Sequence, residues 1–519
     1  MPMRIGIDVG GTHTDAVLLD GDELVASTKA LTSADVTSGI LEALEIVLGD
    51  AGIDAANVAA VMLGTTQFTN AVVERRELAE VAAIRLGLPS GEGVPPMIGW
   101  PDDIAAALGG QVYQLGGGYL YDGQPLSALD DADIDAVVED IRGKGLRSVA
   151  IASPFSPMNA EPELHVAERL RRAIPDARIT CSHRIGRIGL LERENAAILN
   201  AALLDFADRV VDAFRSAFRQ RQLDARFFVS QNDGTLMDAE FVRQYPALTF
   251  ASGPTNSLRG ACRLTGLKDA IVVDIGGTTS DIGVLQDGFP RESNVVIEVG
   301  GVRTNFRMPD VLAVGLGGGS LVSADGSRVG PQSVGHRLVS EGLVFGGDTL
   351  TATDLVVAAG DADIGDASRV AGLDRALVDA GIDALHTLLE QNIERMKPSG
   401  RAMPVVLVGG GAVLVSRPLA NAPELLRPEN AGVANAIGAA IAQIGGEAER
   451  LIAYTELPRE EAIRQVSDEA RSLAAAAGAD PATVRIAEVD ETSVAYLTDG
   501  TTRVRVKAVG DIAGLGARA

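Results

Sequence analysis

The chain has 519 residues, a formal net charge of −25 and a sequence pI near 4.6. This acidity argues against nucleic acid and anionic membrane surfaces as partners, because both carry negative charge. Two cysteines cannot supply a disulfide framework, and no apolar run approaches the ~18–20 residues of a membrane span. The first nine residues already lead into a predicted strand and leave no room for a removable leader. We therefore expect a cytoplasmic protein of two or three domains.

The first predicted elements are two apolar strands, Arg4–Asp8 and Asp15–Leu19, joined by a glycine turn. Glycine permits positive φ, and successive N–H groups on such a turn form a concavity that binds an anion. Threonine hydroxyls add further donors. The residues that this pattern predicts to cradle a phosphate are Gly10, Gly11, Thr12 and Thr14.

Strands and helices alternate through the rest of the first half, around a Gly/Pro-rich stretch from 87 to 123 that we expect to be an insertion with loops. The predicted strands are Glu23–Leu31, Val58–Leu63, Ser148–Ile151 and Arg178–Cys181. The predicted helices are Gly39–Leu48, Ala71–Arg76, Asp130–Lys144, Glu161–Ala173 and Leu190–Gln222.

Polar residues at two helix starts have two interpretations each. Thr65, Thr66 and Asn70 could line a substrate cleft, or could cap the helix that begins near Ala71. Glu192 and Arg193 could contact substrate, or could form an ion pair at a domain hinge. Cys181 and His183 are the nearest approach to a metal-ligand pair, but two possible ligands more often belong to a core or loop, so we expect no structural zinc.

The glycine turn recurs past the midpoint, after the strand Ala270–Asp274 and before the strand Asp281–Leu285. Asp274-Ile-Gly-Gly-Thr-Thr-Ser-Asp281 matches Asp8-Val-Gly-Gly-Thr-His-Thr-Asp15 at an offset of 274 − 8 = 266 residues. A repeat this far apart favours two related domains that face each other, rather than a solenoid. The second set of predicted phosphate-binding residues is Gly276, Gly277, Thr278 and Thr279.

Other elements surround the second turn. The predicted strand Arg226–Val229 comes first, and Ser252 lies in a turn before the predicted helix Ser257–Thr265. A small-residue helix is predicted at Asn435–Ile444. Two later glycine clusters, one of them after the strand Pro404–Val408, extend the predicted nucleotide-binding set to Gly317, Gly318, Gly409, Gly410 and Gly411.

The pattern of predicted elements changes from about Glu449 onward. A helix is predicted at Pro458–Ala477, and strands at Val484–Val489 and Val494–Val509, with Asp499-Gly500 as a hairpin signal. We interpret 449–519 as a small α+β appendage.

The carboxylates at the strand ends are the predicted catalytic residues. Asp8 and Asp274 would hold Mg²⁺, directly or through water, and so offset the charge of a nucleotide phosphate. Asp15 and Asp281 could orient a nucleophile, or could merely pin their hairpins. The two turns together predict a nucleotide whose phosphates are bound from both sides.

These motifs resemble the hydantoinase A / 5-oxoprolinase family, within the actin / sugar kinase / heat-shock ATPase superfamily. The resemblance covers most of residues 3–445. Beyond the two hairpins, it rests on motifs in one order along the chain: Gly64-Thr-Thr-Gln-Phe-Thr-Asn70, Glu192-Arg193, Ser252-Gly-Pro254, Asp310, Gly317-Gly-Gly-Ser320, Arg328–Ser333 and Thr351–Asp354. The chain departs from the pattern where Leu312-Ala313 replace a histidine, and at Thr255-Asn256-Ser257 after Ser-Gly-Pro.

The resemblance implies an α/β fold in which two ribonuclease-H-like domains face a nucleotide cleft. We place the first domain at 1–180 and the second at 181–448, followed by the appendage. It also implies an ATP-dependent amidohydrolase that phosphorylates the carbonyl of a cyclic amide, with a larger companion subunit in an oligomer. The alternatives are an ATP-dependent carboxylase subunit, a small-molecule kinase, and a nucleotide-responsive regulatory subunit with little turnover.

Overall fold

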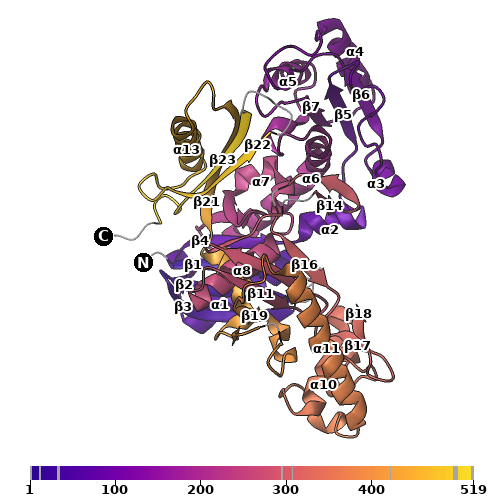
Figure 1. The fold of residues 1–519 in the computed structure, drawn as a ribbon, viewed down its shortest axis with the longest axis vertical. Helices are drawn as coiled ribbons and strands as arrows, with labels where there is room; N and C mark the ends of the chain where they lie inside the picture. The colour runs from indigo at the N-terminus through magenta and orange to yellow at the C-terminus, as the bar shows by residue number, and fades with distance from the viewer. Residues whose placement is uncertain are drawn as a thin grey trace.

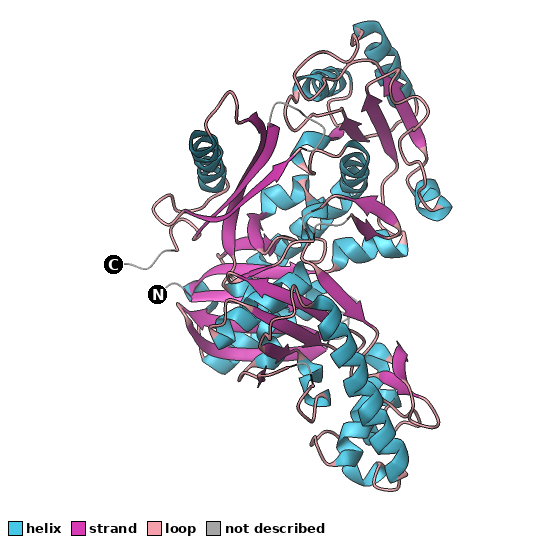
Figure 2. Ribbon diagram, in the orientation of Figure 1, coloured by secondary structure: helices cyan, strands magenta, loops and turns pink. Residues whose placement is uncertain are grey.

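The computed structural model describes residues 3–10, 13–31, 36–293, 296–306, 308–420, 422–494 and 501–515. Two mixed sheets form the centre of the molecule, and a smaller parallel sheet lies to one side of them (Figures 1 and 2). None of the described helices is long and apolar enough to cross a bilayer.

The first sheet has nine strands in the order β22-β23-β21-β10-β9-β4-β1-β2-β3. β1 pairs antiparallel with β2 and parallel with β4. The strands are β1 (Met3–Val9), β2 (His13–Asp20), β3 (Glu23–Leu31), β4 (Val58–Thr65), β9 (Arg226–Ser230), β10 (Thr235–Asp238), β21 (Gln443–Ala453), β22 (Arg485–Ser493) and β23 (Thr501–Gly510).

Alternation along the strands gives this sheet two different faces. Ile5 and Ile7 pack in a core that includes α1 (Val36–Ala51) and α6 (Leu190–Gln220). Gly6, on the other face, lies against α12 (Ala434–Ala440), where an added Cβ would be 2.1 Å from the carbonyl oxygen of Ala436.

The second sheet repeats this arrangement. Ile271 and Val273 pack toward α10 (Ala352–Ala359) and α11 (Arg375–Met396), whereas Val272 packs toward α8 (Ser252–Thr265). α8 and α12 therefore lie between the two sheets (Figure 1). The strands are β13 (Phe289–Pro290), β12 (Ser280–Gln286), β11 (Ala270–Ile275), β19 (Val405–Val408), β20 (Leu425–Leu426) and, paired with β12, β16 (Val311–Val314).

The third sheet is entirely parallel, with α4 (Asp131–Gly143) and α5 (Glu161–Ala173) packed on it. Its order is β6 (Gln111–Leu115), β5 (Val81–Leu86), β7 (Ser148–Ala152), β8 (Arg178–Cys181). The stretch 87–123, predicted as an insertion with loops, also contains β6 and a helix, α3 (Asp102–Ala107). The remaining elements are α2 (Gln67–Glu74), α7 (Ala239–Gln244), α9 (Leu338–Glu341), α13 (Arg459–Ala476) and the two-stranded sheets β14 (Ile297–Val299) with β15 (Val302–Thr304) and β17 (Ser320–Val322) with β18 (Val329–Ser333).

The C-terminal segment 449–519 is not a separate appendage, which corrects our interpretation. β21 pairs parallel with β10, and β23 pairs with β21 along its length, so these strands extend the first sheet. The predicted helix at 435–444 ends at Ala440, and strand β21 starts at Gln443. The first sheet thus crosses both predicted domain boundaries, at 180/181 and at 448/449, while the predicted hairpin turn Asp499-Gly500 lies outside the described residues.

α8 and α12 cross with their backbones in contact. An added Cβ at Gly260 would lie 1.8 Å from the carbonyl oxygen of Ala434, and one at Gly438 would lie 1.8 Å from that of Asn256. Since backbone atoms cannot rotate away as a side chain can, this crossing fixes the position of α8 between the sheets.

Gly260→Ala should therefore destabilise the protein by about 3 kcal/mol, the upper part of the range for overpacking a tight site. Gly253→Ala, on the same helix with open space around it, should cost nothing and could add up to about 1 kcal/mol of helix propensity. Urea unfolding of both variants measures the difference. Equal stability of the two variants would contradict the close crossing.

Candidate phosphate-binding site

The two hairpins share the same closing backbone hydrogen bond. The Gly10 N–H donates to the carbonyl of His13 over 3.0 Å, and the Gly276 N–H donates to the carbonyl of Thr279 over 2.9 Å. The strand registers also match, since Asp8 is opposite Asp15 and Asp274 is opposite Asp281. The repeat seen in the sequence is therefore a structural repeat, one hairpin per sheet. Gly11 and Thr12 lie outside the described residues.

All four aspartates are on the inner faces of their sheets. Asp8 lies on the same face of β1 as Gly6, which contacts α12. Asp15 lies on the same face of β2 as Val17, which also packs against α12. Asp274 lies on the same face of β11 as Val272, and Asp281 lies on the same face of β12 as Gly283. Val272 and Gly283 both face α8. Because side chains alternate along a strand, the four carboxylates are directed into the space between the two hairpins.

Burial, followed by repulsion between carboxylates, makes three of these carboxyl groups unusually basic. Burial, then the nearby charge of Asp15, raises the pKa of Asp8 to about 7. Burial, then Asp274, raises the pKa of Asp281 to about 7. Burial likewise raises the pKa of Asp274. Asp15 is paired with Lys29 of β3, whose Nζ lies 2.6 Å from its carboxylate.

Gly317 and Gly318 support the second hairpin from behind, where we had predicted contact with nucleotide. The N–H groups of Gly318 and Gly319 donate to the carbonyls of Gly276 and Gly277, over 3.0 and 2.7 Å. The Gly318 N–H is therefore engaged and cannot serve a phosphate. An added Cβ at Gly317 would lie 2.5 Å from the Thr278 nitrogen, so the contact also requires glycine.

This support orients the donors of the hairpin. In a trans peptide the carbonyl and the next N–H point in opposite directions, so the N–H groups of Gly277 and Thr278 point away from the supporting loop. Neither N–H has a hydrogen-bond partner within the described part of the chain. Thr278 and Thr279 are exposed, whereas Thr14 is buried in β2. The second hairpin thus presents two unused backbone donors, as an anion site requires.

The cluster Gly409–Gly411 lies against the same hairpin. An added Cβ at Gly409 would be 2.2 Å from Asp274 Oδ1, and one at Gly411 would be 2.8 Å from the Gly276 carbonyl oxygen. Gly410 is exposed, with the Lys29 side chain 4.0 Å from its would-be Cβ. Lys29 belongs to the first sheet, so the two halves of the site meet here. That these three glycines contact nucleotide stays a prediction.

Three polar residues that sequence reasoning missed hold the aspartates. Asn256 Nδ2 donates to Asp8 Oδ1 over 3.4 Å, and Asn435 Nδ2 donates to Asp8 Oδ2 over 3.0 Å. Ser257 Oγ donates to Asp274 Oδ2 over 2.5 Å. Asn256 and Ser257 stood out only as a departure from the family pattern, and the helix was predicted to begin at Ser257 rather than at Ser252.

The predicted substrate residues of β4 and α2 lie beside the first hairpin. Thr66 Oγ1 is 3.5 Å from the Val9 carbonyl oxygen, and Asn70 Nδ2 is 3.4 Å from Thr66 Oγ1. Thr65 is buried and accepts a hydrogen bond from the N–H of Gln67, the first residue of α2, whereas the N-cap residue Thr66 makes no side-chain capping bond. Ser252, also buried, donates to the Thr65 carbonyl over 3.4 Å.

Arg193 is a structural residue, which contradicts its predicted contact with substrate. Its guanidinium is completely buried and donates to Ser182 Oγ and to the carbonyls of Ser153, Arg187 and Ile188. These bonds join the ends of β7 and β8 to the start of α6. Glu192 is half-buried and lies 3.7 Å from Arg303 rather than pairing with Arg193.

The fold brings Glu163 into contact with the Cys181–His183 segment. The buried Glu163 carboxylate accepts hydrogen bonds from the Ser153 N–H, from Ser182 Oγ, and from the backbone and Nδ1 of His183. Burial, then the charge of Glu163, raises the pKa of Cys181 to about 12, so this thiol is neutral. Hydrogen bonds from protein donors thus satisfy the Glu163 carboxylate without a metal ion.

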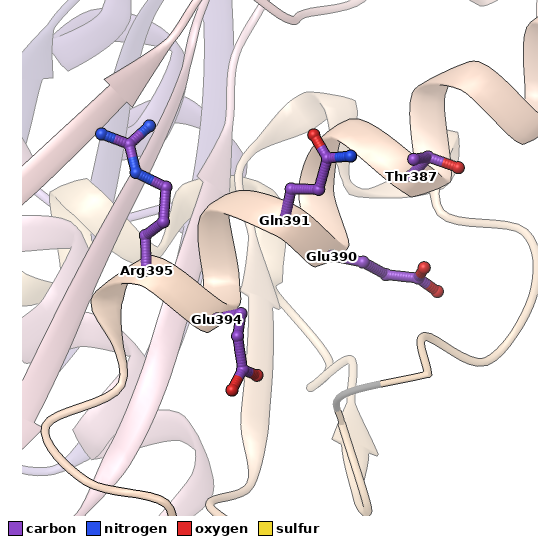
Figure 3. Close-up of a pocket in the computed structure, with 5 residues that line it drawn as sticks. All are labelled: Thr387, Glu390, Gln391, Glu394 and Arg395. Carbon is purple, nitrogen blue, oxygen red and sulfur yellow. The ribbon is translucent and has the colours of Figure 1, made fainter.

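A hollow also lies along α11 (Figure 3). Its lining side chains all come from this single helix and belong to neither hairpin: Thr387, Glu390, Gln391, Glu394 and Arg395. The hairpins, with carboxylates and free backbone donors, are the better candidate site. Carboxylate oxygens are the ligands that Mg²⁺ prefers, and outward N–H donors suit phosphate, so the residues present fit a metal–nucleotide complex.

Comparison with known proteins agrees with this geometry. The hydantoinase/oxoprolinase N-terminal region matches residues 4–174, and the hydantoinase/oxoprolinase family profile matches residues 193–369. Caprolactamase subunit alpha of Pseudomonas jessenii is 28% identical over 426 residues, which cover 75% of this chain and 58% of that protein. The acetophenone carboxylase gamma subunit of Aromatoleum aromaticum is 27% identical over 395 residues, covering 69% of this chain and 53% of that one. The chain thus spans little more than half the length of these relatives.

Solved structures show the same fold. The ATP-dependent caprolactamase from Pseudomonas jessenii has a TM-score of 0.78 at 19% identity, covering 98% of this chain and 87% of that one. Nucleotide-free acetone carboxylase has a TM-score of 0.66 at 17% identity, covering 98% and 88%. The predicted α/β class is confirmed.

Gly317→Ala should weaken nucleotide binding by displacing the second hairpin. The added methyl group would meet backbone atoms of Gly277 and Thr278, so the hairpin has to move. Gly432→Ala, with open space around it, is the control. Calorimetric titration with a nonhydrolysable ATP analogue should show at least about tenfold weaker binding for Gly317→Ala, the cost of misplacing donors that bind charged groups. Unchanged affinity would contradict the supporting role of this loop.

The raised pKa of Asp281 predicts a pH effect on stability. A free aspartate has a pKa near 3.9, whereas Asp281 has a pKa of about 7 in the folded protein. Between about pH 4 and 7 the folded state therefore holds the extra proton, and this carboxyl lowers the free energy of unfolding as pH rises. Asp281→Asn removes that loss, so the stability of the variant relative to wild type should increase across this window. A difference that is constant with pH would refute the assignment, and Asp287→Asn, in the exposed turn that follows the same strand, is the control.

Proposed function

Because the chain belongs to the hydantoinase/oxoprolinase family, we propose that it uses ATP to phosphorylate the carbonyl oxygen of a cyclic amide before the ring opens. The observation that carries this proposal is the pair of matched hairpins with four inward carboxylates. Caprolactamase and a 5-oxoprolinase are among the relatives that support a lactam, imide or hydantoin as the substrate.

The chemistry addresses the low reactivity of an amide. Resonance stabilises the carbonyl, so water attacks an unstrained lactam slowly. Transfer of the γ-phosphoryl group to the carbonyl oxygen breaks its bond to ADP and forms a phosphorylated imidate. Water then adds to the ring carbon, and collapse of this adduct breaks the C–N bond while the departing amine takes up a proton, so the ring opens to an acyl phosphate. A second water hydrolyses the acyl phosphate to the free acid and phosphate. The protein contributes positioning and charge stabilisation.

Each hairpin residue has a role in this proposal. The Gly277 and Thr278 N–H groups bind the phosphates, together with the donors that the sequence predicts at Gly10, Gly11 and Thr12. Asp8 and Asp274 hold Mg²⁺, which supplies positive charge to offset the phosphate oxygens. Asp15 is neutralised by Lys29 and pins its hairpin. Asp281 has no hydrogen-bond or ionic partner among the described residues, so it is the carboxylate we assign to orienting the nucleophile.

The space beside the first hairpin is the proposed place for the ring. Thr66 is half-buried at the start of α2 next to Val9, and the exposed Asn70 lies one helical turn further on, next to Thr66. Their hydroxyl and amide can donate to and accept from a lactam. Ser252 and Thr65 are buried and shape this region from within.

A carboxylase subunit is the second candidate. Bicarbonate can accept the phosphoryl group in place of the amide oxygen, and the same hairpins would serve it. Two relatives favour this alternative, the acetophenone carboxylase gamma subunit and the acetone carboxylase beta subunit of Xanthobacter autotrophicus. Ring-opened acid as the product distinguishes the amidohydrolase from the carboxylase.

We also propose a companion subunit. Several relatives are named as subunits of larger enzymes, and this chain spans 53–58% of the first two. Ring opening requires both phosphorylation and controlled attack by water. A partner subunit that delivers or excludes water would couple ATP hydrolysis to opening of the ring.

Substrate-dependent ADP release tests the proposal. Wild type, alone and with a co-expressed companion, is assayed against lactams, hydantoins and 5-oxoproline for ADP and ring-opened acid. Asp281→Asn should lower turnover about 10²–10⁴-fold, the usual contribution of a general base, and leave nucleotide affinity nearly unchanged. Asp287→Asn should turn over like wild type. Absence of ring-opened acid with every substrate, in the presence of the companion, would refute the amidohydrolase assignment.

A further inference from the structure

Two consecutive residues of α8 contact different hairpins. Asn256 donates to Asp8 of the first sheet, and Ser257 donates to Asp274 of the second. Successive residues of an α-helix project about 100° apart, so a helix that lies between two hairpins reaches both with neighbouring side chains. One rigid element thus sets the distance between the two carboxylates.

Close backbone contacts fix the position of α8 near Asn256 and Ser257. Gly438 of α12 lies directly on the Asn256 carbonyl, and Gly260 of α8 lies on that of Ala434. Gly64 of β4 provides the room in which the side chains meet, since an added Cβ would lie 2.3 Å from Asp8 Oδ1 and 2.5 Å from Asn256 Nδ2. Backbone contacts, rather than flexible side chains, hold the donors in place.

Asn256 also has an unused acceptor. Its side chain is completely buried, and its Oδ1 has no hydrogen-bond partner among the described residues. Since Asp8 can only accept when ionised, the amide must direct Nδ2 toward it, which leaves Oδ1 as the free atom. Buried polar atoms are nearly always paired, so this oxygen indicates a donor that arrives with a ligand.

We propose that Asn256 and Ser257 are positioning residues that hold Asp8 and Asp274 at the separation needed to share one divalent cation, with Asn256 Oδ1 accepting from a water of that cation. The inference rests on the proposed function for the identity of the ligand. Asn435 supports the same arrangement through the other oxygen of Asp8. Asn256 and Ser257 act through the aspartates and through water, and not on the phosphoryl group.

Mn²⁺ binding tests the proposal without turnover. Calorimetry measures the affinity of Mn²⁺ for the protein saturated with the β,γ-imido analogue of ATP, and a separate titration with EDTA measures analogue binding without metal. Ser257→Ala removes one oxygen and leaves the helix intact. Thr265→Val is the matched control, because it loses a hydroxyl that, in the described part of the chain, bonds to Ala261 and Leu267 of its own segment.

Ser257→Ala and Asn256→Ala should each weaken Mn²⁺ binding about 10- to 100-fold, as loss of residues that orient metal ligands does. Metal-free analogue binding should stay at the wild-type value, Ser257→Thr should restore Mn²⁺ affinity, and Thr265→Val should match wild type. Wild-type Mn²⁺ affinity in Ser257→Ala, or an equal loss of metal-free binding, would overturn the positioning role alone. No binding of Mn²⁺ or analogue by wild type would overturn the proposed function as well.

Discussion

The interaction on which the site depends is the repulsion among four aspartates at the ends of two hairpins. Asp8, Asp15, Asp274 and Asp281 all face inward, where low dielectric strengthens both repulsion and attraction. Without a ligand, the protein offsets part of this charge with Lys29 and with neutral donors on α8 and α12. Burial, and then the repulsion that remains, raises the pKa of Asp8 and the pKa of Asp281 to about 7. A bound cation would reduce this repulsion, so the four inward carboxylates are more stable with a cation than without one.

Close approach of backbones makes this arrangement possible. Gly6, Gly260 and Gly438 allow β1, α12 and α8 to pack with no intervening side chains, and the inner faces of both sheets come together over these helices. Gly317 likewise packs against the backbone of the second hairpin, and the N–H groups of Gly318 and Gly319 donate to the hairpin carbonyls of Gly276 and Gly277. Stability and function are coupled here, because the contacts that position the sheets also orient the backbone N–H donors of the second hairpin.

Local patterns were sufficient to predict the hairpins and much of the fold. Strand parity and a glycine turn are properties of adjacent residues, so the inward aspartates follow from sequence alone. Long-range contacts were not accessible in this way. The pairing of β21 with β10 joins residues about two hundred positions apart, and no local signal separates that strand from an appendage. Likewise a charged residue at a helix start, such as Arg193, looks the same whether it contacts substrate or ties strand ends together. Asn256 gained its role only through the crossing of α8 and α12.

The central claim is that both hairpins bind one nucleotide together. Titration of the chain with the nonhydrolysable ATP analogue in Mg²⁺, comparing wild type with Asp8→Asn and Asp274→Asn, tests it most directly. The account predicts one site per chain in wild type and loss of that same site in either single variant, with both variants still folded. Full-affinity binding in either variant, or two independent sites of which each variant loses one, would contradict it.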